Sequence, residues 1–227
     1  MRHRPSVIAF DVIETMFPLD PLQARLKEAG LRGESLQVWF ARILRDGMAL
    51  TLTGEFKSFP DVAEAALKGL MTEHGLPAAE ESVKKVVSGF GQLSPHEDVR
   101  PSLELLGAAS VRAIALTNGT ASITGKLLAK AGLGHLVEKV VSIDEVRQWK
   151  PARAVYLQAM LAAGVSADQM ALVAAHAWDV RGAVAAGLTT AWLPRQEKRF
   201  SDVMGKPDVK GGTLLDAVQQ LLMLPPR

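Results

Sequence analysis

The sequence predicts an α/β fold: a doubly wound parallel sheet with helices on both faces, interrupted by an inserted helical cap. Two observations lead to this fold class. From residue 96 onward, short apolar runs alternate with helical patterns, which is typical of a parallel sheet covered by helices. Between residues 11 and 117, the chain is longer than the roughly 30 residues of a simple strand–helix–strand unit, and it shows helical periodicity with almost no strand signal.

Five short apolar runs are the expected strands of the core. They cover residues 6–10, 113–116, 140–143, 170–174 and 190–193, and helical patterns lie between the later ones at 123–131, 154–163 and 180–186. Gly132, Gly164 and Gly187 follow these three helical patterns, and glycine is the residue that most often follows the last turn of a helix. Strands and helices of these lengths predict strand–helix–strand units with parallel strands.

Apolar residues at helical spacing predict the insertion. One stripe runs over residues 36–44 and a second over residues 83–90. Prolines stand at both ends of the segment, where a helix begins or ends most readily. We therefore expect an α/β core made of residues 1–17 and 96–227, and a helical cap made of residues 18–95.

Composition argues against several classes of protein. The chain has 227 residues, of which 48% are hydrophobic, and its net charge is 26 − 24 = +2 without a basic stripe, so we expect no nucleic-acid partner. It contains no cysteine, which excludes disulfides, thiolate metal ligands and a thiol nucleophile. No apolar run approaches a membrane span, and the first one is too short for a signal peptide. We expect a cytoplasmic protein with no membrane partner.

Polar residues follow four of the expected strands. Asp11 ends the first strand, and Thr15 lies one turn further on. The others are Thr117, Asn118 and Gly119 after the second strand, Lys150 and Tyr156 beyond the third, and His176, Trp178 and Asp179 after the fourth. Because ligands of doubly wound sheets bind outside the carboxyl ends of the strands, we expect these residues to meet at one crevice.

Each of these residues also has an ordinary structural explanation. An Asp after a strand is more often a turn residue or a helix cap than a nucleophile, and a Thr-Asn-Gly sequence alone is a common turn. A lysine before a proline is commonly solvated, and Tyr156 and His176 are equally compatible with packing. Four strand ends that carry suitable residues in one order are harder to explain in this way, so the constellation as a whole predicts an active site.

The order of these residues resembles the haloacid dehalogenase superfamily of aspartate-nucleophile hydrolases. Its first motif is a hydrophobic run followed by D-x-x-x-T, matched by Asp11 and Thr15. Its second is a Ser or Thr that ends the next strand, matched by Thr117. A lysine commonly followed by proline is matched by Lys150, and an acid after the next strand by Asp179. The resemblance covers essentially the whole chain and implies a Rossmann-like core with the helical insertion as its cap.

Two features point away from the phosphatases of this superfamily. The first motif of those enzymes resembles D-x-D, in which the second Asp is the general acid and base for the leaving alcohol. Ile13 stands at that position here. They also usually carry a second acid four residues from the one in the fourth motif, to hold magnesium, and here Ala175 takes that place. The segments LTNGT, WKPARAVY and AAHAWDVRGAVAAGLTTAWLPR are similar to the L-2-haloacid dehalogenases instead. A halide leaves without protonation, so such an enzyme needs no acid at Ile13.

The sequence departs from those dehalogenases around the expected substrate. They have an Arg after a Trp on the cap helix, thought to hold the substrate near its leaving group, whereas Phe40 follows Trp39 here. Arg42 and Arg45 fall about 200° and 140° round the helix from Phe40. Further departures are Ile13 in place of an aromatic residue, and Ala174 and His176 in place of a Ser and an Asn.

The resemblance implies a reaction in two steps. Asp11 attacks the electrophilic carbon and forms an aspartyl ester, and water then cleaves that ester, with His176 as a candidate base. Lys150 would keep Asp11 ionised, and Asp179 would hold Lys150. The expected catalytic residues are Asp11, Thr117, Lys150 and Asp179, and the expected substrate-binding residues are Thr15, Trp39, Phe40, Asn118, Gly119, Tyr156, His176 and Trp178.

We therefore expect a cofactor-independent hydrolase that resembles the 2-haloacid dehalogenases, acts on carbon–halide bonds and takes a small organic acid as its substrate. Two alternatives stay open. A magnesium-dependent phosphatase of the same superfamily would bind the metal at Asp11 and Asp179. A small-molecule binding protein with weakened catalysis would account for Ile13, Phe40 and Ala174. A homodimer is an open alternative for its assembly.

Overall fold

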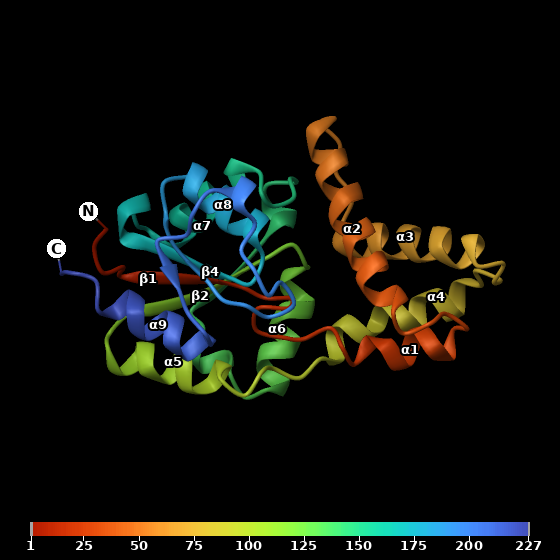
Figure 1. Cartoon of the computed structure of the whole chain (residues 1–227), viewed down its shortest axis with the longest axis horizontal. Helices are drawn as coiled ribbons and strands as arrows, with labels where there is room; N and C mark the ends of the chain where they lie inside the picture. Colours follow the sequence, from red (N-terminus) through yellow and green to blue (C-terminus); the bar gives the residue numbers. More distant parts are fainter. Residues whose placement is uncertain (1, 227) are drawn as a thin grey trace.

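The computed structural model describes residues 2–226, which contain a six-stranded sheet with helices on both faces (Figure 1). The strands are β1 (Val7–Asp11), β2 (Arg112–Thr117), β3 (Lys139–Ser142), β4 (Met170–Ala174), β5 (Thr189–Trp192) and β6 (Val209–Lys210). They pair in parallel in the order β3-β2-β1-β4-β5-β6. The predicted α/β fold is confirmed. The two residues of β6 are too few to give a periodic signal in the sequence.

Two groups of helices cover the sheet. Figure 1 shows α5 (Val99–Ala108), α6 (Ala121–Lys130) and α9 (Leu214–Leu222) on one face, and α7 (Arg153–Ala163) and α8 (Ala177–Ala185) on the other. Short 3-10 helices occupy Ser88–Gln92, Gly134–Leu136, Ile143–Glu145, Ala167–Gln169 and Asp202–Met204. Gly164 ends α7 with a φ of 67°, a conformation that glycine adopts without strain. None of the helices within residues 2–226 combines the length and apolar character that crossing a membrane requires.

Strand β1 lies in the middle of the sheet, between β2 and β4. All five of its residues are buried, which explains why they are almost continuously apolar. The chain adds β2 and β3 on one side of β1 and β4 to β6 on the other, so the strand order reverses at β1. The crevice outside its carboxyl end is therefore the usual ligand site of such a sheet, and Asp11 is the last residue of β1.

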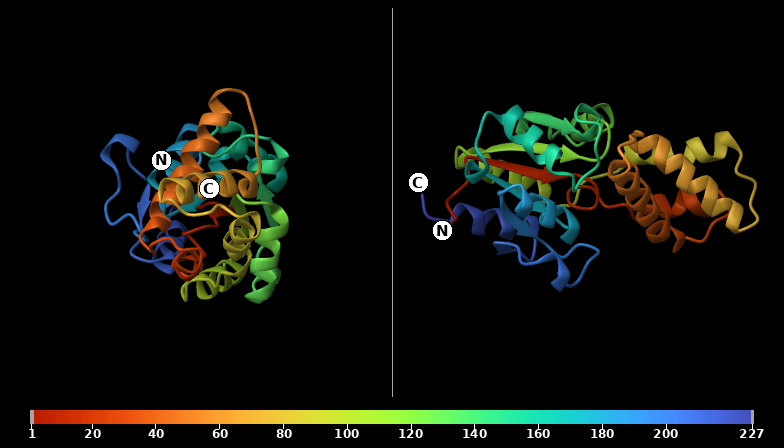
Figure 2. Two further views of the ribbon diagram at one scale, coloured as in Figure 1. Left: turned by 90° about the vertical axis from the view of Figure 1, so that its right-hand side faces the viewer. Right: turned by 90° about the horizontal axis from the view of Figure 1, so that it is seen from above.

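Four helices between β1 and α5 form a separate unit at this end of the sheet, away from both chain termini (Figures 1 and 2). They are α1 (Leu22–Glu28), α2 (Ser35–Leu52), α3 (Phe59–Glu73) and α4 (Glu80–Val87). The unit has its own apolar interior, in which the rings of Trp39 and Phe90 lie 5.4 Å apart. Ser58 begins α3 with a reciprocal capping box to Asp61.

Trp149 joins this helical unit to the loop that carries Lys150. Its indole nitrogen donates to the carbonyl oxygen of Lys57 at 3.1 Å, and its backbone N–H donates to the Thr51 hydroxyl at 2.9 Å. Its ring stacks on Phe59, and a side chain at Gly47 would overlap the indole. Helix α2 is thus held directly against the segment that precedes the lysine.

Candidate active site

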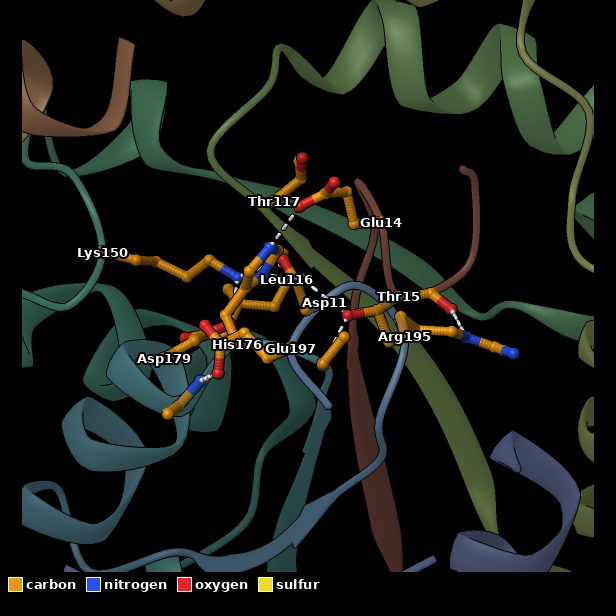
Figure 3. A network of polar contacts seen from close by, with 12 residues as sticks. Asp11, Glu14, Thr15, Leu116, Thr117, Lys150, His176, Asp179, Arg195 and Glu197 are labelled. Atoms are coloured by element: carbon orange, nitrogen blue, oxygen red, sulfur yellow. Dashed lines mark hydrogen bonds and ion pairs between the residues drawn. The ribbon is translucent and has the colours of Figure 1, made fainter. Parts of the chain in front are cut away.

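Lys150 links two carboxylates, Asp11 at the carboxyl end of β1 and Asp179 in the first turn of α8, the helix that follows β4 (Figure 3). Its Nζ atom lies 2.7 Å from Asp11 Oδ1 and 2.6 Å from Asp179 Oδ2, and it donates to the Leu116 carbonyl oxygen at 3.0 Å. The lysine is fully buried. These three acceptors use all three hydrogens of the ammonium, so its charge is held in one place without water.

The electrostatics of this pair favour its ionised form. Burial by itself would raise the pKa of Asp11, but the Lys150 ammonium and a hydrogen bond from His176 lower it below its ordinary range. Burial likewise opposes the charge of Lys150, yet Asp11 and Asp179 raise the pKa of that lysine above its usual value. Asp11 is thus a carboxylate at neutral pH, as a nucleophile must be.

Asp179 is held from its other side by Tyr156. The tyrosine hydroxyl donates to Asp179 Oδ1 at 2.6 Å, and burial keeps its pKa well above the ordinary value, so it stays a donor. Burial raises the pKa of Asp179, and the Lys150 ammonium opposes that effect. A side chain at Gly182 would overlap the tyrosine hydroxyl, so this glycine is what lets α7 and α8 approach. Tyr156 lines no cavity above Asp11 and acts as a positioning residue.

Thr15 connects Asp11 to the end of β4. Its hydroxyl donates to Asp11 Oδ2 at 2.8 Å and accepts the backbone N–H of Ala175 at 2.9 Å. The side chain is fully buried. Thr15 therefore fixes the orientation of the carboxylate.

His176 stands between Asp11 and Glu14 (Figure 3). Its Nδ1 atom lies 3.1 Å from Asp11 Oδ2, and its Nε2 atom lies 2.8 Å from Glu14 Oε2. Glu14 reaches the ring because the turn after β1 is tight: its φ is 64°, and its N–H donates to the Phe17 carbonyl at 2.8 Å. A left-handed conformation is uncommon for a residue with a side chain and is often found at functional sites.

The two carboxylates keep His176 protonated. Burial alone would lower its pKa, but the hydrogen bonds to Asp11 and Glu14 raise the pKa of His176 from 6.5 to about 10. The ring also lies between two aromatic side chains, with centroids 5.1 Å from Trp178 and 6.0 Å from Phe40. The free protein thus holds an imidazolium beside Asp11 at neutral pH.

This protonation makes stability depend on pH in a predictable direction. The folded-state pKa of His176 lies above its ordinary value, so the stabilisation is fully present below about pH 6.5 and is lost as pH rises through about 10. We expect the melting temperature to fall over that range, and to fall less steeply in His176→Gln, which has no titrating ring. Differential scanning calorimetry at a series of pH values measures both slopes, and equal slopes would show that His176 is not charged in the folded state.

A small cavity of about 10 Å³ lies directly over Asp11, enough for one water molecule. A second cavity of about 150 Å³ adjoins it and shares four lining residues, Phe40, Leu44, His176 and Trp178. The helical unit supplies Phe40, Leu44 and Phe59 to the walls of the smaller one. The remaining walls come from Asp11, Ile13, Thr117, Asn118, His176 and Trp178 of the core.

The segment after β2 shapes the floor of this cavity. The Asn118 side chain accepts the backbone N–H of Lys150 through Oδ1 at 2.9 Å. The Gly119 N–H donates to the Thr117 hydroxyl at 2.9 Å, and the Gly119 carbonyl accepts the Ser142 hydroxyl at 2.8 Å. Both polar backbone groups of Gly119 are thus used within the protein, while Thr117 and Asn118 line the cavity.

The structure brings most of the expected site residues together, but not all of them. Trp39 lies inside the helical unit, where its indole donates to the Ala63 carbonyl, and it lines neither cavity. Arg42 and Arg45 also lie outside, bonded to Glu73 and Asp46.

Glu14 is the charged site residue that the sequence analysis missed, and Leu44 and Phe59 are cavity-wall residues that it also missed. The available signal was an acid within the nucleophile motif together with a histidine after β4.

The two acids that a magnesium site would use do not fit a metal ion here. Lys150 Nζ lies between Asp11 and Asp179 and binds both carboxylates, so the lysine ammonium occupies the position that a metal ion would need. Within residues 2–226, no group of three or more His, Cys, Asp or Glu side chains is placed to hold a metal ion.

Comparison with known proteins gives a consistent result. A family model described as haloacid dehalogenase-like hydrolase matches residues 7–187. The (S)-2-haloacid dehalogenase 2 of Pseudomonas sp. (strain CBS-3) is 28% identical over 178 residues, 78% of this chain and 78% of that protein. The haloacetate dehalogenase H-2 of Moraxella sp. (strain B) is 26% identical over 219 residues, 96% of this chain and 97% of that protein.

A solved structure shares both the fold and the helical unit. The L-2-haloacid dehalogenase from Xanthobacter autotrophicus superimposes with a TM-score of 0.89 at 25% identity, over 96% of this chain and 98% of that one. Because the family model spans most of the sequence and the aspartate, lysine and second aspartate meet at one sheet edge, the chain belongs to the haloacid dehalogenase-like hydrolases.

Proposed function

We propose that the protein releases halide from a small 2-halogenated organic molecule through an ester of Asp11. The observation that carries this proposal is the buried Asp11 carboxylate at the end of β1, held at one oxygen by Lys150 and at the other by Thr15. The relatives are named as 2-haloacid and haloacetate dehalogenases, so small halogenated organic acids and their derivatives are the first substrates to test.

In the first step, an oxygen of Asp11 attacks the carbon that bears the halogen. The carbon–halogen bond breaks, the halide leaves with the bonding electrons, and an aspartyl ester remains. No proton donor is required, which agrees with the apolar Ile13 in the cavity wall. Lys150 keeps Asp11 ionised beforehand and stabilises its orientation during the attack.

In the second step, ester formation changes the charge beside His176. The ester carries no negative charge, so one of the two groups that raise the pKa of His176 is lost. His176 then gives up its Nδ1 proton to solvent, while Glu14 continues to accept the hydrogen on Nε2. Nδ1 of the neutral ring is thus the atom that takes a proton from the attacking water. The hydroxide adds to the Asp11 carbonyl carbon, the alcohol leaves with the proton of that hydroxyl group, and Asp11 is restored as a carboxylate beside the protonated His176. The net release is one halide and one proton for each water consumed.

The helical unit, residues 18–95, is proposed to act as a cap over this chemistry. A cavity of about 10 Å³ is too small for an organic substrate, so entry requires that Phe40, Leu44 and Phe59 move away from Asp11. Closure then excludes bulk water from the ionised carboxylate.

Mass spectrometry of the peptide that contains Asp11 tests the proposal. With 2-chloropropionate or 2-chloropropionamide, wild-type protein should release chloride equally with and without EDTA. His176→Gln should accumulate the ester because general-base assistance, worth about 10²- to 10⁴-fold, is lost. His135→Gln, at an exposed histidine, is the matched control and should behave as wild type. An absence of ester on Asp11 in every variant would refute the covalent mechanism, and loss of chloride release in EDTA would favour the magnesium-dependent alternative.

A further inference from the structure

The formal charges of the side chains around Asp11 are out of balance. Three buried carboxylates, those of Asp11, Glu14 and Asp179, face two buried cations, Lys150 and His176. The cluster therefore has a formal excess of one negative charge. An anionic substrate would add a second excess charge in a space with almost no water, where like charges repel strongly and desolvation is costly.

Both cations are already committed to the protein. Lys150 uses its three hydrogens on Asp11, Asp179 and Leu116, and His176 uses both ring nitrogens on Asp11 and Glu14. Within residues 2–226, no other lysine or arginine lines either cavity. A substrate carboxylate would find no free charged donor.

The other polar groups suit an uncharged polar substrate. Thr117 and Asn118 supply a hydroxyl and a side-chain amide to the cavity wall, which suit a carbonyl oxygen. Glu14 Oε1 is buried and has no hydrogen-bond partner, and Glu14 lines the adjoining cavity. A buried carboxylate oxygen without a donor is costly, and an N–H group on the substrate would satisfy it. A carboxylate substrate has no such hydrogen to offer.

We infer that this site takes an uncharged 2-halogenated amide in preference to the free 2-halogenated carboxylate. The inference rests on the proposed function, because it assumes that Asp11 displaces the halide. The products from a 2-chlorocarboxamide are the 2-hydroxycarboxamide, chloride and one proton. The amide bond itself is not broken.

A matched pair of substrates tests the preference. Chloride release is measured from 2-chloropropionamide and from 2-chloropropionate, which share one carbon skeleton and one leaving group. Each kcat/KM is divided by the rate at which free acetate displaces chloride from the same compound, which removes intrinsic reactivity. The expected ratio favours the amide by about ten- to a hundredfold, the range for one hydrogen bond to a charged group. Isobutyramide should likewise inhibit the wild-type protein more strongly than isobutyrate.

Two variants at Phe40 make the test specific to charge. Phe40→Arg places a guanidinium at the cavity wall and should raise kcat/KM for the carboxylate by about ten- to a hundredfold. Phe40→Met removes the ring without adding charge and should keep the preference for the amide. If Phe40→Arg does not fold, the inhibition of the wild-type protein by the two isobutyryl compounds decides the question alone.

The possible failures are distinguishable. Faster turnover of the carboxylate, with the ester on Asp11 detected, would overturn the inference and leave the proposed function standing. Stronger inhibition by isobutyrate than by isobutyramide would also overturn it. No chloride and no ester from either compound would refute the proposed function, and the inference with it.

Discussion

Asp11→Asn is expected to reduce halide release by at least about three orders of magnitude, the scale on which enzymes lose rate when their nucleophile is removed. The amide has no ionised oxygen for the attack, although it retains the shape of the carboxylate. The fold should persist, because the cluster around Lys150 has an excess of negative charge and Asp179 still pairs with the lysine. Halide release and the free energy of unfolding in urea measure the two effects.

The control for this variant addresses the chemistry of asparagine itself. Deamidation would regenerate Asp11, so the mass of the intact peptide must be followed over the same period as the assay. Asp202→Asn, at an exposed aspartate, should retain full activity. Substantial activity in Asp11→Asn without deamidation would show that another group is the nucleophile.

Lys150→Met should have the largest effect on stability. Methionine fills a similar volume but leaves Asp11 and Asp179 buried without their ammonium. Removing one partner of a buried ion pair costs about 3–5 kcal/mol, so the free energy of unfolding at pH 7 should fall by about that amount. Lys84→Met, at an exposed lysine, is the matched control and should change stability by less than about 0.5 kcal/mol.

The deficit of Lys150→Met should shrink in acid. Pairing with Lys150 lowers the pKa of Asp11, so it contributes stability above the ordinary value of 3.8 that is lost as pH falls below it. A protonated carboxyl has less need of the ammonium, so wild type and variant should converge toward low pH. Urea denaturation at pH 3 and pH 7, on either side of that value, measures the difference, and a constant deficit would contradict this account.

The sequence predicts the strands of the core better than their edges. Strands β1, β2 and β4 are almost fully buried runs of five or six residues in which apolar side chains dominate, so their signal is local. Strand β6 has two residues and forms by pairing with β5, which no local pattern records. Helix α8 begins at Ala177, before the apolar pattern at residues 180–186 that predicts it, because His176 is the N-cap and the first helical turn follows it directly.

Prediction of the active site from the sequence is limited in the same way, because the sequence carries only local patterns. Residues at strand ends could be predicted to converge, because parallel strands place their carboxyl ends along one edge. Trp39 and Phe40 could not be separated, since neighbours on a helix differ by about 100° and both fit an apolar stripe. The structure turns Phe40 to the cavity and Trp39 to the interior of the helical unit. The role of Glu14 depends on a left-handed backbone angle and on a histidine 162 residues away.

The contact between Glu14 and His176 has a consequence for how such proteins diverge. Glu14 alone would be a buried acid with no partner, in a backbone conformation that glycine adopts more easily. His176 alone would lose one of the two carboxylates that keep its ring charged. Acquiring Glu14 without His176, or His176 without Glu14, thus costs stability. Homologous chains are expected to carry both residues or neither, and mutational paths that separate them should pass through less stable intermediates.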